Sequence, residues 1–193
     1  MWDRWMAFRN DAGEVVPAFG VLRVTGVALR GLTPVLTVEK PNEVLQRSYW
    51  LNGPMQVAAG GFGLCTCEVA YALFNSGTPS VGEGWGAVPG EWTLSKNAVD
   101  SFEILGDAAE GLVLVKPMEV TQLIGKLDGA LSVGGSATVS VWTGAGGSES
   151  DSTMNVTAFD WLMKAGAAAV ASGKKVKLEW VNGQWYVTNA ECA

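Results

Sequence analysis

A chain of 193 residues and 20.3 kDa is long enough for one large domain or two small ones, each with its own hydrophobic core. The formal net charge of −6 and a pI of about 4.7 argue against electrostatic binding to nucleic acid, and the most basic stretch, Ser172–Lys177, holds only three lysines. No stretch approaches the roughly 20 apolar residues of a membrane span. The start, Met1–Asp11, lacks the apolar core of a signal peptide, so we expect synthesis in a cytoplasm.

Glycine is the clearest indication of fold class. The chain contains 25 glycines, about twice the usual share of roughly 7%. They lie at the ends of short segments in which apolar and polar residues alternate, which is typical of strands joined by many turns. We therefore predict a mainly β protein built from two small β-barrel or β-sandwich units.

The first half reads as strands interrupted by one long loop. Glu14–Leu29 and Pro34–Pro41 alternate in the manner of strands, with Gly or Pro at the joints. Ser48–Phe74 continues this pattern. Asn75–Trp92 carries seven Gly or Pro at turn-like spacing and is predicted to be a long ordered loop, after which Trp92–Asp107 returns to strand.

A domain boundary is predicted where a short run of valine and leucine ends in Lys-Pro, at Leu114–Pro117. It divides the chain into an N-terminal domain, residues 1–116, and a C-terminal domain, residues 117–193. No periodic repeat is predicted, because the echo between "MQVAAGG" and "LSVGG" is too short to indicate one.

The C-terminal domain is predicted to hold four or five strands and one short helix, the element count of an OB-like or SH3-like barrel. Thr121–Gly144 contains a clear alternation, Gly144–Ser152 is a polar loop, and Thr153–Phe159 is a strand. The helix is expected within Asp160–Gly173, with Asp160 as its N-cap and Gly173 as its stop.

The last element, Lys175–Val187, is a predicted β-hairpin. Asn182-Gly183 favours a two-residue type I′ turn, which needs positive φ at both central residues. With Val181 opposite Gln184, one face of the ribbon becomes apolar. That face consists of Val176, Leu178, Trp180, Trp185 and Val187.

The residue types restrict the chemistry. With no histidine in the chain, Ser-His-Asp and Cys-His catalysis and His-containing zinc sites are excluded. Glu83 and Glu91 could form the carboxylate pair of a glycosidase, but we interpret both as solvated loop charges. The glycines of Ala58–Gly63 lack the partners of a phosphate-binding loop and are interpreted as turn residues. We therefore predict no enzymatic activity, no catalytic residues and no cofactor.

The cysteines number three: Cys65, Cys67 and Cys192. An odd count that includes a pair two residues apart argues against a disulfide framework. We interpret them as buried thiols. A metal site would have to combine them with a carboxylate, and no such site is predicted.

Nine tryptophans are the strongest compositional oddity. Most of them, including the pair in the terminal hairpin, are expected in the core. We expect two or three at the surface as partner-binding anchors, first Trp85 or Trp92 in the glycine-rich loop and then Trp2 and Trp5 at the terminus.

Three stretches carry a resemblance: "FRNDAGEVVPAFGVLRVTGV", "GEGWGAVPGEWTL" and "VKLEWVNGQWYVTNAEC". Together they resemble the small structural proteins encoded by tailed bacteriophages and prophages. The resemblance implies a component of the virion, at the capsid surface, the neck or the tail, made in the host cytoplasm. Its partners would be other virion proteins and further copies of this chain in a symmetric oligomer.

A carbohydrate-binding β module is the alternative. It would use Trp85 and Trp92 as a stacking platform and take a cell-surface glycan as its ligand. An enzyme that uses Glu83 and Glu91 is the third hypothesis and has the least support. The sequence predicts neither a membrane span nor direct contact with nucleic acid.

Overall fold

The structure is a computed structural model that describes residues 5–75, 77–143, 149–161 and 169–191. These residues form strands, turns and bends, and no helix occurs among them. The mainly β fold predicted from the sequence is confirmed. The chain forms two compact units, one of Met1–Asn42 with Gln46–Glu119 and one of Glu43–Leu45 with Val120–Ala193. The expected helix falls mostly on residues 162–168, which lie outside the described residues.

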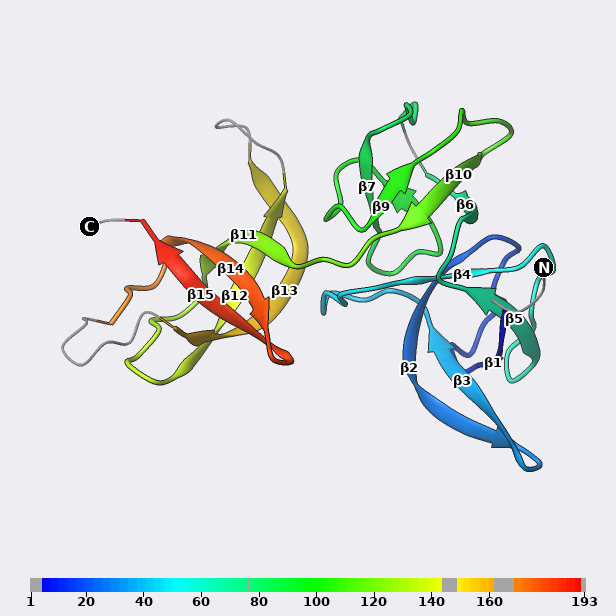
Figure 1. The fold of residues 1–193 in the computed structure, drawn as a ribbon, viewed down its shortest axis with the longest axis horizontal. Helices are drawn as coiled ribbons and strands as arrows, with labels where there is room; N and C mark the ends of the chain where they lie inside the picture. Colours follow the sequence, from blue (N-terminus) through cyan, green and yellow to red (C-terminus); the bar gives the residue numbers. More distant parts are fainter. Residues whose placement is uncertain (1–4, 76, 144–148, 162–168, 192–193) are drawn as a thin grey trace. The chain divides into compact units, whose positions relative to one another are not determined.

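The first unit begins with a closed five-stranded barrel, barrel 1 (Figure 1). Its strands pair in the order β1-β3-β2-β4-β5, and β5 closes onto β1. The pair β1 and β3 is parallel and all other pairs are antiparallel. The strands are β1 (Met6–Asn10), β2 (Val21–Arg30), β3 (Thr33–Glu39), β4 (Trp50–Asn52) and β5 (Phe62–Thr66).

The same unit continues into a second five-stranded sheet, sheet 2, in the order β6-β10-β9-β7-β8. All its strand pairs are antiparallel. A single parallel bridge joins Leu94 in the edge strand β8 to Phe74, the residue after the other edge strand. The strands are β6 (Ala70–Leu73), β7 (Gly84–Ala87), β8 (Leu94–Ser95), β9 (Phe102–Ile104) and β10 (Leu112–Pro117).

The second unit is another closed barrel, barrel 3, in the order β11-β12-β13-β15-β14. Strand β14 closes onto β11, and the pair β13 and β15 is parallel. The segment Glu43–Leu45 belongs to this unit because it pairs with Asn155 of β13. The strands are β11 (Gln122–Leu127), β12 (Ser136–Thr143), β13 (Ser150–Asp160), β14 (Lys175–Val181) and β15 (Gln184–Ala190).

All three sheets share one order of pairings. In barrel 1 and in sheet 2, the first strand along the chain is the parallel neighbour of the third. From the third strand the sheet continues through the second, the fourth and the fifth, and the fifth strand pairs with the first. Barrel 3 has the same cycle, but its chain enters at the strand equivalent to β4. The chain therefore contains a threefold structural repeat, which the sequence analysis did not predict.

One hydrogen-bonded turn recurs at the same place in each sheet. The turn lies directly before β2, β7 and β14, and one of its residues has positive φ. The backbone N–H of that residue donates to a carbonyl at the end of β9 or β11, or one residue after the end of β4. Glycine tolerates this backbone region best, and it fills the position in two of the three turns. The bonds are Phe19 N to Gly53 O (3.0 Å), Gly82 N to Ile104 O (2.8 Å) and Gly173 N to Leu127 O (2.8 Å).

The short echo in the sequence lies at equivalent places of barrels 1 and 3. Val57 forms an isolated bridge before β5, and Leu131 forms one before β12. Three residues after each, Gly60 and Gly134 both have φ of 70°. The two glycines therefore make the same turn, and the echo marks the repeat.

The terminal hairpin agrees with its prediction in register and turn. Val181 lies opposite Gln184 and Trp180 opposite Trp185. Asn182 has φ of 48° and the glycine after it has φ of 88°, as a type I′ turn requires. Four of the five residues predicted on the apolar face are buried, and the fifth, Trp180, is half-buried and packs edge-on against Trp185.

The long loop predicted at Asn75–Trp92 is partly wrong. Strand β7 lies within it and pairs with β8 and β9. The strand was missed because two of its four residues are glycines, which weaken the apolar alternation that indicates a strand. Gly86 is required there, since an added Cβ would lie 2.1 Å from the carbonyl oxygen of Val99.

Candidate functional site

The β2–β3 hairpin of barrel 1 extends beyond the barrel as a two-stranded ribbon (Figure 1). Strand β4 pairs with β2 only at Val21 and Leu22, and β1 pairs with β3 only from Leu36 onward. Between these limits and the turn at Gly31, the two strands pair only with each other. Such a ribbon is marginally stable in water without further packing.

The ribbon exposes apolar side chains that continue the inner face of the barrel. Val27 lies opposite Leu36, which packs against the core, and Leu29 lies opposite Pro34 on the same face. Val27 and Leu29 are each 68% exposed, and Leu32 at the turn is 97% exposed. An apolar surface that leaves the barrel and stays exposed is typical of a docking site.

A β-bulge decides on which face of the ribbon these side chains lie. Thr25 is the extra residue between the pairs Val24–Val38 and Gly26–Thr37. Its hydroxyl donates to the Thr37 carbonyl at 3.2 Å and lies 3.1 Å from the Thr37 hydroxyl. Before the bulge, even-numbered residues of β2 such as Val24 share the face of Leu36. After the bulge, the odd-numbered residues Val27 and Leu29 lie on that face.

The structure overturns the expectation that Trp85 and Trp92 are surface anchors. Trp85 is fully buried in β7, where its indole N–H donates to Glu83 at 3.1 Å and its ring packs edge-on against Phe74. Trp92 is 8% exposed. Neither ring can form a stacking platform, so the alternative of a carbohydrate module built on these two residues is wrong.

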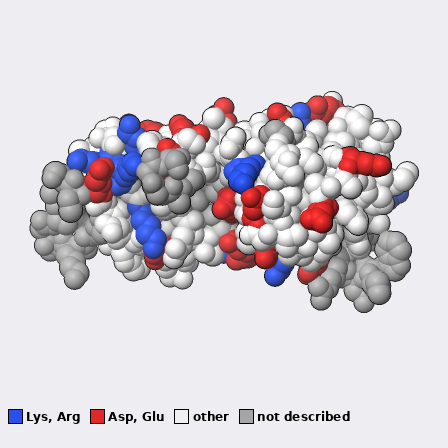
Figure 2. Space-filling view, turned by 90° about the horizontal axis from the view of Figure 1, so that it is seen from above, with Lys and Arg blue, Asp and Glu red and all other residues white. Residues whose placement is uncertain are grey.

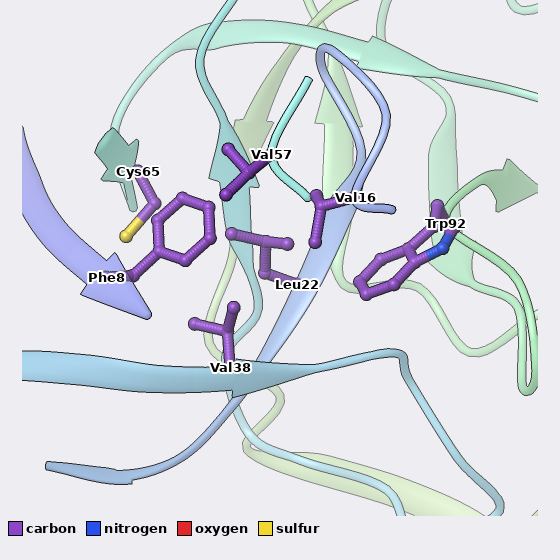
Figure 3. Close-up of a cluster of buried hydrophobic side chains, with 7 residues drawn as sticks. All are labelled: Phe8, Val16, Leu22, Val38, Val57, Cys65 and Trp92. Atoms are coloured by element: carbon purple, nitrogen blue, oxygen red, sulfur yellow. The ribbon is translucent and has the colours of Figure 1, made fainter. Parts of the chain in front are cut away.

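Trp92 instead completes the core of barrel 1 (Figure 3). It lies between β7 and β8 of sheet 2, yet it belongs to the buried cluster of barrel 1, where its ring faces Val16 and Leu22 and Phe8 lies on the far side of the cluster. The Val21 N–H donates to the Trp92 carbonyl at 2.8 Å, and Lys40 Nζ lies 5.5 Å from the indole centroid. Sequence reasoning missed this role because flanking glycine and proline suggested an exposed loop.

The remaining predicted anchors lie at the start of the chain. Trp5 is half-buried and lies over Gly53, where an added Cβ would approach its ring to 3.4 Å. Trp2 lies outside the described residues. The partner-binding role of both stays a prediction.

The carboxylates of Glu83 and Glu91 are hydrogen-bonded to different neighbours. Glu83 accepts hydrogen bonds from Lys96 Nζ at 2.5 Å and from the Trp85 indole, and the Lys96 bond, as the largest cause, lowers the pKa of Glu83. Glu91 accepts from Asn75 and Thr93, each at 2.8 Å. Each acid therefore has neighbours that hold it in place.

The cysteines differ in accessibility. Cys65 is fully buried in the core of barrel 1, and burial raises the pKa of its thiol to about 12. Cys67 is exposed, so the expectation of a buried thiol is wrong there. Two residues apart, they fall on either side of the end of β5, where the chain leaves the barrel. Cys192 lies outside the described residues.

Among the described ranges, His, Cys, Asp and Glu nowhere gather in a group of three that could hold a metal ion. No helix in the described part of the chain is long and apolar enough to cross a membrane. Comparison with protein-family models, with curated proteins and with solved structures found no match. The fold and the hairpin define a mainly β protein with an exposed apolar ribbon.

Proposed function

We propose that the chain is a non-enzymatic structural component of a tailed-phage virion, at the capsid surface, the neck or the tail. It acts through protein–protein contacts in a symmetric assembly. The carrying observation is the exposed apolar ribbon of β2 and β3, with Val27, Leu29 and Leu32 as its contact residues. The resemblance of the three sequence stretches to phage structural proteins supplies the setting.

The fold supports this proposal. We propose that barrel 3 is OB-like, because its strand order runs first, second, third, fifth and fourth, with the third and fifth parallel. Small barrels joined in one chain present many loops to neighbouring subunits. Residues 1–116 and 117–193 remain the proposed domains.

Sheet 2 contains an internal example of the proposed docking. The connection from β7 to β8 is topologically equivalent to the β2–β3 hairpin. It places Trp92 in the core of barrel 1. The equivalent loop of barrel 1, with Leu32 almost fully exposed, is free to dock in the same manner on a neighbouring subunit.

The test uses particles produced from the genome that encodes this chain. Mass spectrometry of purified virions should find the protein in stoichiometric amount. In V27S/L29S/L32S, each serine removes a docked side chain worth about 1.5–3 kcal/mol, and each 1.4 kcal/mol lost weakens binding about tenfold. The triple variant should therefore fall at least ~10-fold in virion content.

The matched control is V81S/V133S, which changes exposed valines of sheet 2 and barrel 3. It should enter virions at the wild-type level, and circular dichroism should show that both variants fold. Absence of the wild-type chain from purified virions would refute the virion role. Normal incorporation of the triple variant would refute docking through the ribbon.

A further inference from the structure

Barrel 3 carries a polar groove of about 430 Å³ on its outer surface. The groove spans β11, β12, the start of β13 and the turn before β14. Its volume lies within the usual range for small-molecule sites. The lining side chains used below are Lys126, Asp128, Ser140, Trp142, Asp151 and Ser172.

Strand alternation places these side chains on the outside. Leu127 and Val141 are buried in the barrel, so their neighbours Lys126 and Trp142 face outward. Lys126 lies opposite Ser140 on the adjacent strand. Trp142 lies opposite Asp151 on the next one, so the groove combines an indole with amino, hydroxyl and carboxylate groups.

The polar groups are held in fixed positions. Ser140 Oγ donates to Asp128 Oδ1 at 2.6 Å, and Ser172 Oγ donates to the Asp128 backbone carbonyl at 2.9 Å. A carboxylate offers about four lone-pair positions. Asp128 therefore has acceptor capacity for a ligand in addition to the bond from Ser140.

The indole of Trp142 is also positioned. Lys175 Nζ lies 5.1 Å from the ring centroid, within the range of a cation–π contact. The same ammonium lies 3.5 Å from Glu149. Trp142 is half-buried and forms one side of the groove. A fixed ring beside hydrogen-bonding groups can stack on a flat ligand while those groups bind its rim.

We propose that this groove binds a neutral carbohydrate, with Trp142 against the C–H face of one sugar ring. Sugar hydroxyls both donate and accept, which matches carboxylates, hydroxyls and an ammonium in one site. The carboxylates of Asp128 and Asp151 accept from hydroxyls, and Lys126 donates to a sugar oxygen.

The charge of the groove selects against anionic ligands. The lining holds two carboxylates and one lysine, and Lys175 beside the Trp142 ring is paired with Glu149, so acidic groups outnumber basic ones and a phosphate or a uronic acid meets net repulsion. On the face that Figure 2 shows, basic and acidic side chains lie side by side over barrel 3. The site does not depend on the virion role.

The experiment screens the full chain against an immobilised panel of neutral oligosaccharides built from glucose, galactose, mannose or N-acetylglucosamine. Heparin and polyuronic acids provide the anionic arm. The neutral oligosaccharide with the strongest signal is then titrated by calorimetry. We expect W142A to weaken its affinity at least tenfold and D128N to weaken it several-fold.

The control is W161A, which removes an exposed tryptophan of barrel 3 that packs on Tyr186 and does not line the groove. It should bind as the wild type does. W142F keeps an aromatic ring and should retain most of the affinity. It replaces W142A in the test if W142A unfolds the barrel. Failure of every neutral oligosaccharide to bind, binding that W142A leaves unchanged, or binding to the anionic arm alone would overturn the proposal.

Discussion

Replacing Trp92 with alanine tests whether sheet 2 completes the core of barrel 1. A buried tryptophan removes about 200 Å² from water, which at ~25 cal/mol/Å² corresponds to about 5 kcal/mol. The Trp92 indole N–H is buried and finds no acceptor among the described residues, and such an unpaired donor costs about 1–3 kcal/mol. The net destabilisation expected for W92A is therefore about 2–4 kcal/mol.

Phenylalanine at this position separates the two contributions. W92F keeps a ring in the core and removes the unpaired donor, so it should destabilise by about 1 kcal/mol or less. A much larger destabilisation in W92A than in W92F indicates a core residue. An exposed anchor would show little change in either variant, usually within ~0.5 kcal/mol.

The assay must separate the two units, since they can unfold independently. Hydrogen exchange followed by mass spectrometry reports on barrel 1 and barrel 3 peptides in the same sample. In W92A, strands β1 and β2 should lose protection while β11 and β12 keep theirs. Unchanged protection of β1 and β2 would refute the packing of Trp92 in this core.

Four further predictions concern single residues. G63A should destabilise the first unit by about 1–3 kcal/mol in urea unfolding, because the added Cβ would lie 2.7 Å from the Phe8 ring. G183A should lower stability by roughly 1–2 kcal/mol, because φ of 88° is unfavourable for alanine. In the folded chain a maleimide should label Cys67 and spare Cys65, as peptide mass spectrometry would show. The Cys65 thiol has its ordinary pKa of about 9 in the unfolded chain and a pKa of about 12 in the folded chain. The stability that the protonated thiol contributes is therefore complete below pH 9 and decreases above it. C65A should reduce this decrease in urea unfolding measured from pH 8 to 10.

The parts of the fold that the sequence predicts depend on local rules. Asn182-Gly183 sets the register of β14 and β15, because a two-residue turn with positive φ fixes which residues lie opposite. In β12 the alternation around Val139 and Val141 matches their burial. In both cases the residues that decide the structure lie within a few positions of each other.

The parts that the sequence misses depend on distant contacts. Nothing within a few residues of Trp92 shows that its ring enters another sheet, since Phe8 and Leu22 are some seventy residues or more away in the chain. The groove at Trp142 was missed for the same reason. Its side chains come together only when β11, β12 and the turn at Ser172 adopt their register. The sequence signal for this site was that Trp142 lies in an alternating strand, on the other face from the buried valines Val139 and Val141.

The threefold repeat was hidden because topology can persist with few shared side chains. Phe19, Gly82 and Gly173 fill the same turn position with two residue types, and what the turns share is positive φ and a backbone hydrogen bond. A sequence comparison scores side chains, whereas this bond requires only an N–H and a carbonyl. The same order of strands can therefore form with different side chains.

The same connection has a different form in each of the three sheets, and this difference explains why, among the described residues, barrel 1 alone has an exposed apolar ribbon. In barrel 3 the connection is the tight turn at Asn182, which leaves no residue free to reach outward. In sheet 2 it is a longer loop whose Trp92 fills the core of barrel 1. In barrel 1 the strands themselves are extended, and the tip residue Leu32 packs on no residue that would shield it. An apolar tip that remains 97% exposed is unfavourable in water unless a partner covers it, and that cost is the physical reason to look for the partner at this hairpin.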